Sequence, residues 1–384
     1  MEPLAVAALV VLLVFVASMV AVEAALSVAI IEIVAGVVAG NVFGIHGAPW
    51  LDFLAPFGGI LLTLLAGAEV DPGLLRSRLR PSLMLGGASF LAPFLAAAAF
   101  ALFVAHWTPR AALIAGCALS TTSLAVVYAV LVETGLNVTE VGKLLMAATF
   151  VTDIGTALAL SILFVVPSFA TAAFFAVSAV VLVLAPRVLP PLFERYGERV
   201  IEPEIKLVFA VLFGLMLLAS VGRSHAVLPV FVLGLVLAPM FHRRPDLLRK
   251  LRVVAFGMVT PFFFIKGGMN VSLGLLGPQV GLLVAFLLVK LAAKSVAVFP
   301  LARLHMPGAA TYTTLLMSTG LTFGTISSVY GLQAGIIDRT QFSVLVTVVI
   351  ASAVVPTIIA QRWFTPRLTR EQQEEVLARE GESM

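Results

Sequence analysis

Thirteen runs of apolar residues follow one another along the chain, separated by charged residues, prolines and glycines. Each run is close to the roughly 20 residues that an α-helix needs to cross a bilayer. Lipid offers no partner to an unpaired backbone group, so each span must be helical. The pattern predicts spans over 3–21, 25–44, 53–70, 82–105, 111–133, 141–166, 170–186, 205–222, 225–241, 253–270, 279–301, 309–332 and 341–361.

Composition agrees with a membrane protein. Of the 384 residues, 61% are hydrophobic and 11% are charged, whereas soluble domains carry roughly 25% charged residues. Mean hydropathy is +1.11. We therefore predict an all-α membrane protein, with a transmembrane domain over residues 1–361 and a cytoplasmic tail over residues 362–384. No attached nucleotide-binding domain is expected.

The charges predict an orientation. Net charge is +4, but the basic residues flank the spans, which excludes a nucleic-acid surface. With the N-terminus outside, the cytoplasmic side holds eighteen of the 24 Lys and Arg residues and the external loops hold three. Cytoplasmic loops are enriched in Lys and Arg. This split predicts a multi-pass protein of the cell inner membrane with a cytoplasmic C-terminus.

An internal repeat is visible at a separation of 200 residues. Gly135 closes the fifth span as Gly335 closes the twelfth, and Gly67 ends the third span as Gly267 ends the tenth. Spans three to seven and ten to thirteen resemble two copies. Seven helices separate them, an odd number, so the copies have opposite orientations. Inverted repeats of this kind are typical of secondary transporters.

Matching spans of the two copies are interrupted by hydroxyls and glycines. The fifth span contains Ser-Thr-Thr-Ser at 120–123, and the twelfth is interrupted over 318–325. Hydroxyls can satisfy the backbone groups that an unwound helix exposes. We therefore predict two discontinuous helices that cross at the midplane and form an ion site. The alternative is that Ser and Thr only let helices pack closely. The helix-break residues are Thr121, Ser318, Thr319, Gly320 and Thr322.

Asp153 lies at the centre of the sixth span, where a charge is costly and needs a reason. Thr149 and Thr156 share its helical face, and Thr152 is adjacent. A carboxylate among hydroxyls suits a small hard cation. Away from water, the same carboxylate could bind a proton instead. A group that holds either a cation or a proton, never both, is the minimum that an antiporter needs. The alternative is a carboxylate permanently paired with a lysine.

Three lysines lie inside spans. Lys290 and Lys294 are four residues apart on one face of the eleventh span, and either could be the counter-charge of Asp153. Lys294 could instead extend towards the interface. Lys266 is a weaker candidate, and the two glycines that follow it would let another helix approach.

Other ionisable residues carry less information. Glu32, in the second span, and Glu69, at the end of the third, are supporting candidates with equally good structural explanations. The single Cys117 excludes a disulfide within the chain, and the five histidines are not clustered at metal-ligand spacing. We expect no cofactor, only the transported Na⁺ or K⁺ and H⁺, and the only metal expected is that cation at Asp153.

At these positions the chain resembles the monovalent cation:proton antiporter family, of the bacterial sodium/proton and potassium-efflux kind. The resemblance is strongest over residues 32–40, 57–71 and 119–163. The broken-helix Thr-Ser of the family falls on Thr122 and Ser123, and its essential pair on Thr152 and Asp153. Its membrane lysine falls on Lys294.

The resemblance also places the family's membrane glutamates on Glu32 and Glu69. It implies a panel (dimerisation) domain, a mobile core domain and a homodimer that works by elevator-like alternating access. One position departs from the pattern, because many sodium/proton members carry Asp-Asp where this chain has Thr152-Asp153. A single carboxylate suggests one-for-one exchange. Potassium-efflux members also have a neutral residue there, so Na⁺ and K⁺ both stay open.

The function predicted is exchange of Na⁺ or K⁺ for H⁺. One alternative is a sodium-coupled organic-anion symporter of related fold, which would need more than one cation site. Another is a non-transporting sensor or scaffold, which would not need two broken helices and a central acid. An enzyme is not expected, because the chain has no His-Glu-x-x-His or Gly-x-Ser-x-Gly motif and no intramembrane aspartate pair.

Overall fold

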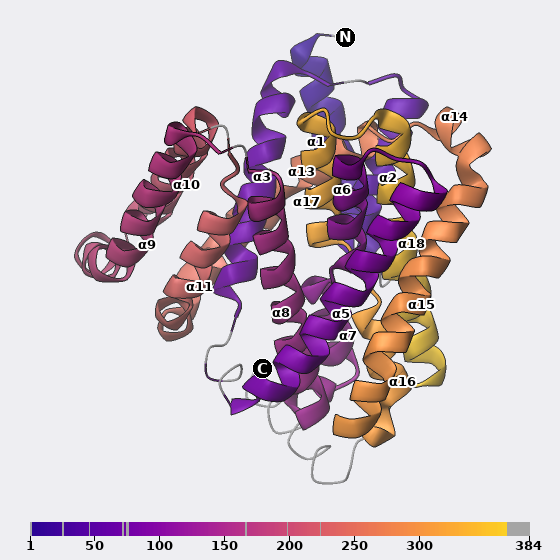
Figure 1. Ribbon diagram of the computed structural model, residues 1–384. Helices are drawn as coiled ribbons and strands as arrows, with labels where there is room; N and C mark the ends of the chain where they lie inside the picture. Colours follow the sequence, from indigo (N-terminus) through magenta and orange to yellow (C-terminus); the bar gives the residue numbers. More distant parts are fainter. Residues whose placement is uncertain are drawn as a thin grey trace. The chain divides into compact units, whose positions relative to one another are not determined.

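The computed structural model describes residues 2–24, 27–45, 47–70, 73, 77–165, 167–197, 199–222 and 224–366. These residues form helices joined by short connections and contain no strand (Figure 1). Each predicted span coincides with a helix or with a helix interrupted at one point, so the all-α prediction is confirmed. The predicted tail lies outside the described residues from 367 onward.

The spans differ in length. Within the described residues, ten helices are long and apolar enough to cross a membrane. Two others are apolar but shorter, α2 (Val28–Asn41) and α11 (Val227–Arg243). The remaining span, the tenth along the chain, is built from α12 (Pro245–Val254) and α13 (Thr260–Met269), joined by a π-helical turn over Ala255–Val259.

The chain divides into two compact units. The first consists of Met1–Pro72 and Ala157–Asn270, and the second of Gly73–Thr156 and Val271–Met384. Besides α2 and α11 to α13, the helices of the first unit are α1 (Pro3–Ala24), α3 (Pro49–Ala68), α9 (Phe169–Tyr196) and α10 (Pro203–Val221). Those of the second unit are α5 (Leu79–Ala99, followed by a π-helical turn over Phe100–Val104), α6 (Pro109–Ser120), α7 (Leu124–Glu133), α14 (Leu273–Leu276), α15 (Val280–His305), α16 (Ala310–Met317), α17 (Thr322–Gln333) and α18 (Arg339–Trp363). Helix α8 (Glu140–Leu163) belongs to the second unit as far as Thr156.

In the first unit, α2 and α13 touch through their backbones. A Cβ atom at Gly36 would lie 2.1 Å from the carbonyl oxygen of Ile265, and one at Gly268 would lie 2.0 Å from that of Ile33. Neither distance is compatible with a side chain, so both positions need glycine for space. This is the close approach expected from the paired glycines after Lys266. Small residues at a helix interface are the usual route to tight packing in membranes.

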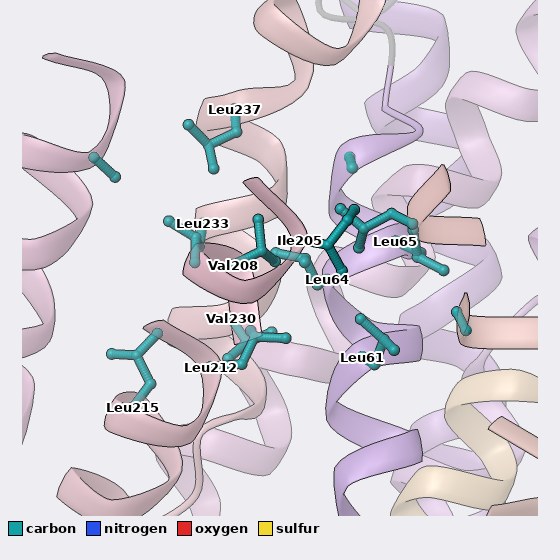
Figure 2. Close-up of a cluster of buried hydrophobic side chains, with 14 of the residues drawn as sticks. Leu61, Leu64, Leu65, Ile205, Val208, Leu212, Leu215, Val230, Leu233 and Leu237 are labelled. Carbon is teal, nitrogen blue, oxygen red and sulfur yellow. The ribbon is translucent and has the colours of Figure 1, made fainter. Parts of the chain in front are cut away.

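The first unit also has an extended apolar core. Figure 2 shows leucine, isoleucine and valine side chains of α3, α10 and α11 gathered in one cluster. Leu61, Leu212 and Val230 within it are completely buried. Lipid is as apolar as leucine, so such contacts stabilise the unit mainly by close van der Waals packing.

Two predicted boundaries were wrong by more than a few residues. The seventh span was predicted to end at residue 186, but α9 continues through three prolines to Tyr196. The tenth was predicted to begin at residue 253, but α12 begins at Pro245. In both places the extra turns carry arginines and lie outside the apolar run, so hydropathy alone could not include them.

His225, in the connection between α10 and α11, predicts a pH dependence of stability. Burial lowers its pKa from the ordinary 6.5 to about 4. The unfolded chain therefore binds a proton in this interval that the folded protein does not, so stability falls as pH drops from about 6.5 towards 4. We expect the thermal midpoint of the purified protein to fall over this interval. The fall should be smaller in His225→Gln, and an equal fall in the variant would contradict this assignment.

The second unit contains the same sequence of elements twice. A helix, a broken helix and a third helix occur as α5, α6–α7 and α8, and again as α15, α16–α17 and α18. The broken helices also end alike, because Gly135 after α7 and Gly335 after α17 have left-handed φ values of 68° and 64°. Both glycines donate to the carbonyl three residues earlier, on Val132 and Leu332. The predicted repeat is thus present in spans four to six and eleven to thirteen. The third, seventh and tenth spans, which the prediction also included, belong to the first unit.

Candidate ion-binding site

Both predicted helix breaks are present. Helix α6 ends at Ser120 and α7 begins at Leu124, with Thr121 and Ser123 in extended conformation between them. Ser123 caps α7 by accepting from the amide of Val126 at 3.5 Å. Ser120 donates to the carbonyl of Cys117 at 3.1 Å. Hydroxyls thus satisfy part of the freed backbone, as expected.

The second break is shorter than predicted. It covers residues 318–321, because α16 ends at Met317 and α17 begins at Thr322. The prediction of an interruption as far as residue 325 was wrong, and Thr322 is the first residue of α17. Ser318 and Thr319 each donate to a carbonyl of the last turn of α16, on Thr314 and Leu316, both at 2.7 Å. The same two carbonyls also accept from backbone amides, that of Thr314 from Ser318 at 3.1 Å and that of Leu316 from Thr319 at 3.2 Å. The hydroxyls therefore add a second donor to each carbonyl at the end of α16.

The two breaks meet. The hydroxyl of Thr122 donates to the carbonyl oxygen of Met317 at 2.9 Å. On the other side, a Cβ atom at Gly320 would lie 3.1 Å from the carbonyl oxygen of Thr121. The crossing brings together two helix C-termini and two helix N-termini, which carry partial negative and partial positive charge.

Asp153 lies beside this crossing and is 3% exposed. Its carboxylate oxygen Oδ1 is 3.5 Å from the hydroxyl of Thr121, which donates. The neighbouring Thr152 accepts from the amide of Thr122 at 3.2 Å and donates to the carbonyl of Thr149 at 2.8 Å. The structure thus brings together Asp153, Thr152, Thr121 and Thr122 around one break.

Two further threonine hydroxyls of α8 can offer oxygen to a cation. Thr149 donates to the carbonyl of Leu145 at 2.9 Å, and Thr156 donates to that of Thr152, also at 2.9 Å. Both are completely buried. A hydroxyl whose hydrogen is directed into its own helix keeps oxygen lone pairs for another partner. Hard cations prefer such oxygen ligands.

Lys294 is completely buried and contacts the first break. Its ammonium donates to the hydroxyl of Ser89 at 2.8 Å, to that of Thr122 at 3.0 Å and to the carbonyl of Thr121 at 3.3 Å. Three acceptors match the three N–H groups of an ammonium. Lys294 therefore holds Thr121 and Thr122 in place, and the hydroxyl of Thr121 is the group that approaches Asp153.

Lys290 is equally buried but has a different partner. Its ammonium donates to the hydroxyl of Ser352 on α18 at 2.8 Å. The five buried residues of α15 are spaced by four and share one face, so both lysines point into the second unit. These residues are Phe286, Lys290, Lys294, Val298 and Ala302.

The remaining candidates belong to the first unit. Glu32 is 2% exposed on α2. Glu69, which follows α3, is ion-paired with Arg252 at 2.8 Å. Lys266 on α13 is ion-paired with Asp52 at 2.7 Å. Roles for these three in transport stay predictions, and for Glu69 and Lys266 the ion pairs supply a structural reason.

Sequence reasoning missed three contributors to the site. Ser89 and Ser352 each accept from a buried lysine, and the backbone carbonyl of Met317 accepts from Thr122. The serines were detectable only as single hydroxyls in apolar spans, which is also the pattern of close helix packing. Within the described residues, no group of three or more His, Cys, Asp or Glu could hold a metal ion.

The family described as "Sodium/hydrogen exchanger, transmembrane" matches residues 2–365 of the chain. This protein belongs to that family. The predicted membership of the cation:proton antiporters is thereby confirmed. A family of transporters also agrees with the expectation that the protein is not an enzyme.

Individual members are distant relatives of this exchanger. The "Probable Na(+)/H(+) antiporter 3" of Methanocaldococcus jannaschii is 24% identical over 334 residues, which are 83% of this chain and 85% of the relative. The "Na(+)/H(+) antiporter NhaS4" of Synechocystis is 26% identical over 331 residues, 80% of each chain. The solved sodium proton antiporter MjNhaP1 of Methanocaldococcus jannaschii has the same fold, with a TM-score of 0.64 at 15% identity, over 94% of this chain and 96% of that one.

Proposed function

We propose that this family member exchanges a monovalent cation, Na⁺ or K⁺, for H⁺, and that both ions compete for Asp153. The observation that carries the proposal is a buried carboxylate beside the crossing of two broken helices. A carboxylate removed from water is stable when a proton or a cation neutralises it. Because it cannot hold both, binding one ion releases the other.

The cation would take oxygen ligands from the same place. Thr121 approaches Asp153, and Thr152, Thr149 and Thr122 offer hydroxyl oxygens around the break. Ser123 is a further candidate from the start of α7. We assign the exchanger no cofactor, because the carboxylate and these oxygens suffice for the proposed exchange.

One-for-one exchange follows if Lys294 keeps its proton throughout. Its three acceptors favour the ammonium form, since a neutral amine has only two N–H groups to donate. One cation entering as one proton leaves moves no net charge. Exchange rates that are unaffected by clamping the membrane potential with valinomycin would support this; rates that follow the potential would contradict it.

Alternating access would move the second unit. Both breaks and Asp153 lie in that unit, so a rigid displacement of it would carry the ion site as a whole. The first unit would then be the panel that joins two copies in a homodimer. In the inner membrane, with the N-terminus outside, the basic loops would face the cytoplasm.

The decisive measurement is proton flux in proteoliposomes after addition of Na⁺, K⁺, Li⁺ or choline at a series of pH values. Competition for one carboxylate predicts that the apparent KM for the cation rises with proton concentration while the maximal rate is unchanged. A maximal rate that falls with acidification at constant KM would contradict competition. Wild-type protein that moves no protons with any cation would favour the symporter or the scaffold.

A further inference from the structure

Lys290 has an unusual setting for a buried lysine. Its side chain is completely buried, and its ammonium donates to Ser352, whose own hydroxyl donates to the carbonyl of Val349 at 2.8 Å. Among the residues that the structure describes, no carboxylate lies within 4.0 Å of this ammonium. Burying a lysine without an opposite charge is costly, so the position of Lys290 needs a reason. Pairing with Asp153 is therefore not what the local contacts of Lys290 suggest.

Gly320, in the second break, lies directly against Lys290. A Cβ atom at Gly320 would lie 2.5 Å from the Lys290 ammonium nitrogen. Gly320 is not among the described glycines with left-handed φ, so conformational freedom does not explain it. An alanine here would have to displace the end of Lys290, whose ammonium is bound to Ser352, and its Cβ would also crowd the carbonyl oxygen of Thr121.

This contact is next to the proposed ion site. The same Cβ atom would lie 3.1 Å from the carbonyl oxygen of Thr121. That oxygen also accepts from the Lys294 ammonium. Met317, three residues before Gly320, accepts from Thr122. A shift of the second break would therefore move groups that surround Asp153.

We propose that Lys290 is a positioning residue: anchored to α18 through Ser352, its ammonium sets the place of the α16–α17 break against the α6–α7 break. Each buried lysine of α15 thus serves one of the two repeat-related breaks, Lys294 the first and Lys290 the second. This inference rests on the proposed exchange only where the test measures exchange rate and KM. The fit between Lys290 and Gly320 is independent of it.

The test adds a methyl group at Gly320, removes the ammonium of Lys290, and then combines the two changes. Gly320→Ala should lower the exchange rate by about tenfold to a hundredfold, because small displacements at a working site have effects of that order. Lys290→Leu, which removes the end of the side chain, should raise the apparent KM for the cation and keep its dependence on proton concentration. The double variant should exchange faster than Gly320→Ala alone. Gly281→Ala, at the start of α15 where nothing lies within 4 Å of an added Cβ, is the matched control and should behave as wild type.

Two results would overturn the proposal. One is a double variant no better than Gly320→Ala, and the other is a Lys290→Leu protein with the wild-type KM. If Gly320→Ala yields little folded protein, the yield and thermal midpoint of the single and double variants give the same comparison. That comparison also works if the wild type moves no protons, so failure of the proposed function and failure of the Lys290–Gly320 coupling are distinguishable.

Discussion

Replacing Asp153 with Asn is expected to reduce cation-driven proton exchange to the level of protein-free liposomes while leaving the protein folded. The amide has nearly the shape of the carboxylate, and its oxygen can still accept from Thr121. It cannot bind and release a proton, and it has no charge to attract a cation. Replacing one carboxylate oxygen by an amide nitrogen should therefore abolish both proton binding and cation binding. The measurement is proton flux in proteoliposomes, with thermal midpoint and size-exclusion profile as measures of folding.

The matched control is Asp338→Asn in the same unit. Asp338 is exposed and caps α18 by accepting from the amide of Gln341 at 2.8 Å. Asparagine caps helices about as well as aspartate, so both exchange and stability should be retained. Cation-dependent proton movement that persists in Asp153→Asn would rule out the carboxylate as the shared site, whatever the control does.

Most of the fold could be predicted because the bilayer restricts the choices. Apolar runs of the right length must be helices. The repeat was detected separately, from matching residues 200 positions apart. The predicted helix ends were less accurate where a helix continues beyond its apolar run, as in α9 and α12. Close packing between helices could be predicted only from paired glycines, as after Lys266. The apolar contacts of α3, α10 and α11 have no comparable sequence pattern.

The site was predictable in its residues and less so in its contacts. Asp153, Thr121 and Thr122 stood out because polar groups in the middle of apolar spans are costly. Their arrangement depends on where the breaks end, and the second break proved shorter than its run of hydroxyls and glycines suggested. Sequence also treated Lys290 and Lys294 as alternatives for one role. Their side chains, one turn apart on α15, contact different breaks.

Replacing Lys294 with Met is expected to lower the exchange rate by at least about tenfold, because the residue holds the break that approaches Asp153. The methionine keeps the length of the side chain but donates nothing. Ser89, Thr122 and the carbonyl of Thr121 would then each lose a buried donor, at about 1–3 kcal/mol for each group left without a partner. We expect a lower thermal midpoint together with the slower exchange.

Lys143→Met, on the exposed part of α8, controls for loss of a lysine in the same unit. Lys143 has 41% of its side chain exposed and is 3.6 Å from Glu140, a surface ion pair that contributes little. The Lys294 variant should also be slower than Lys290→Leu, because Lys294 contacts the segment next to Asp153 directly whereas Lys290 acts through Gly320. If Lys294→Met exchanges ions at the wild-type rate, the first break keeps its position without the ammonium. The argument for one-for-one exchange, which depends on that ammonium, would then fail.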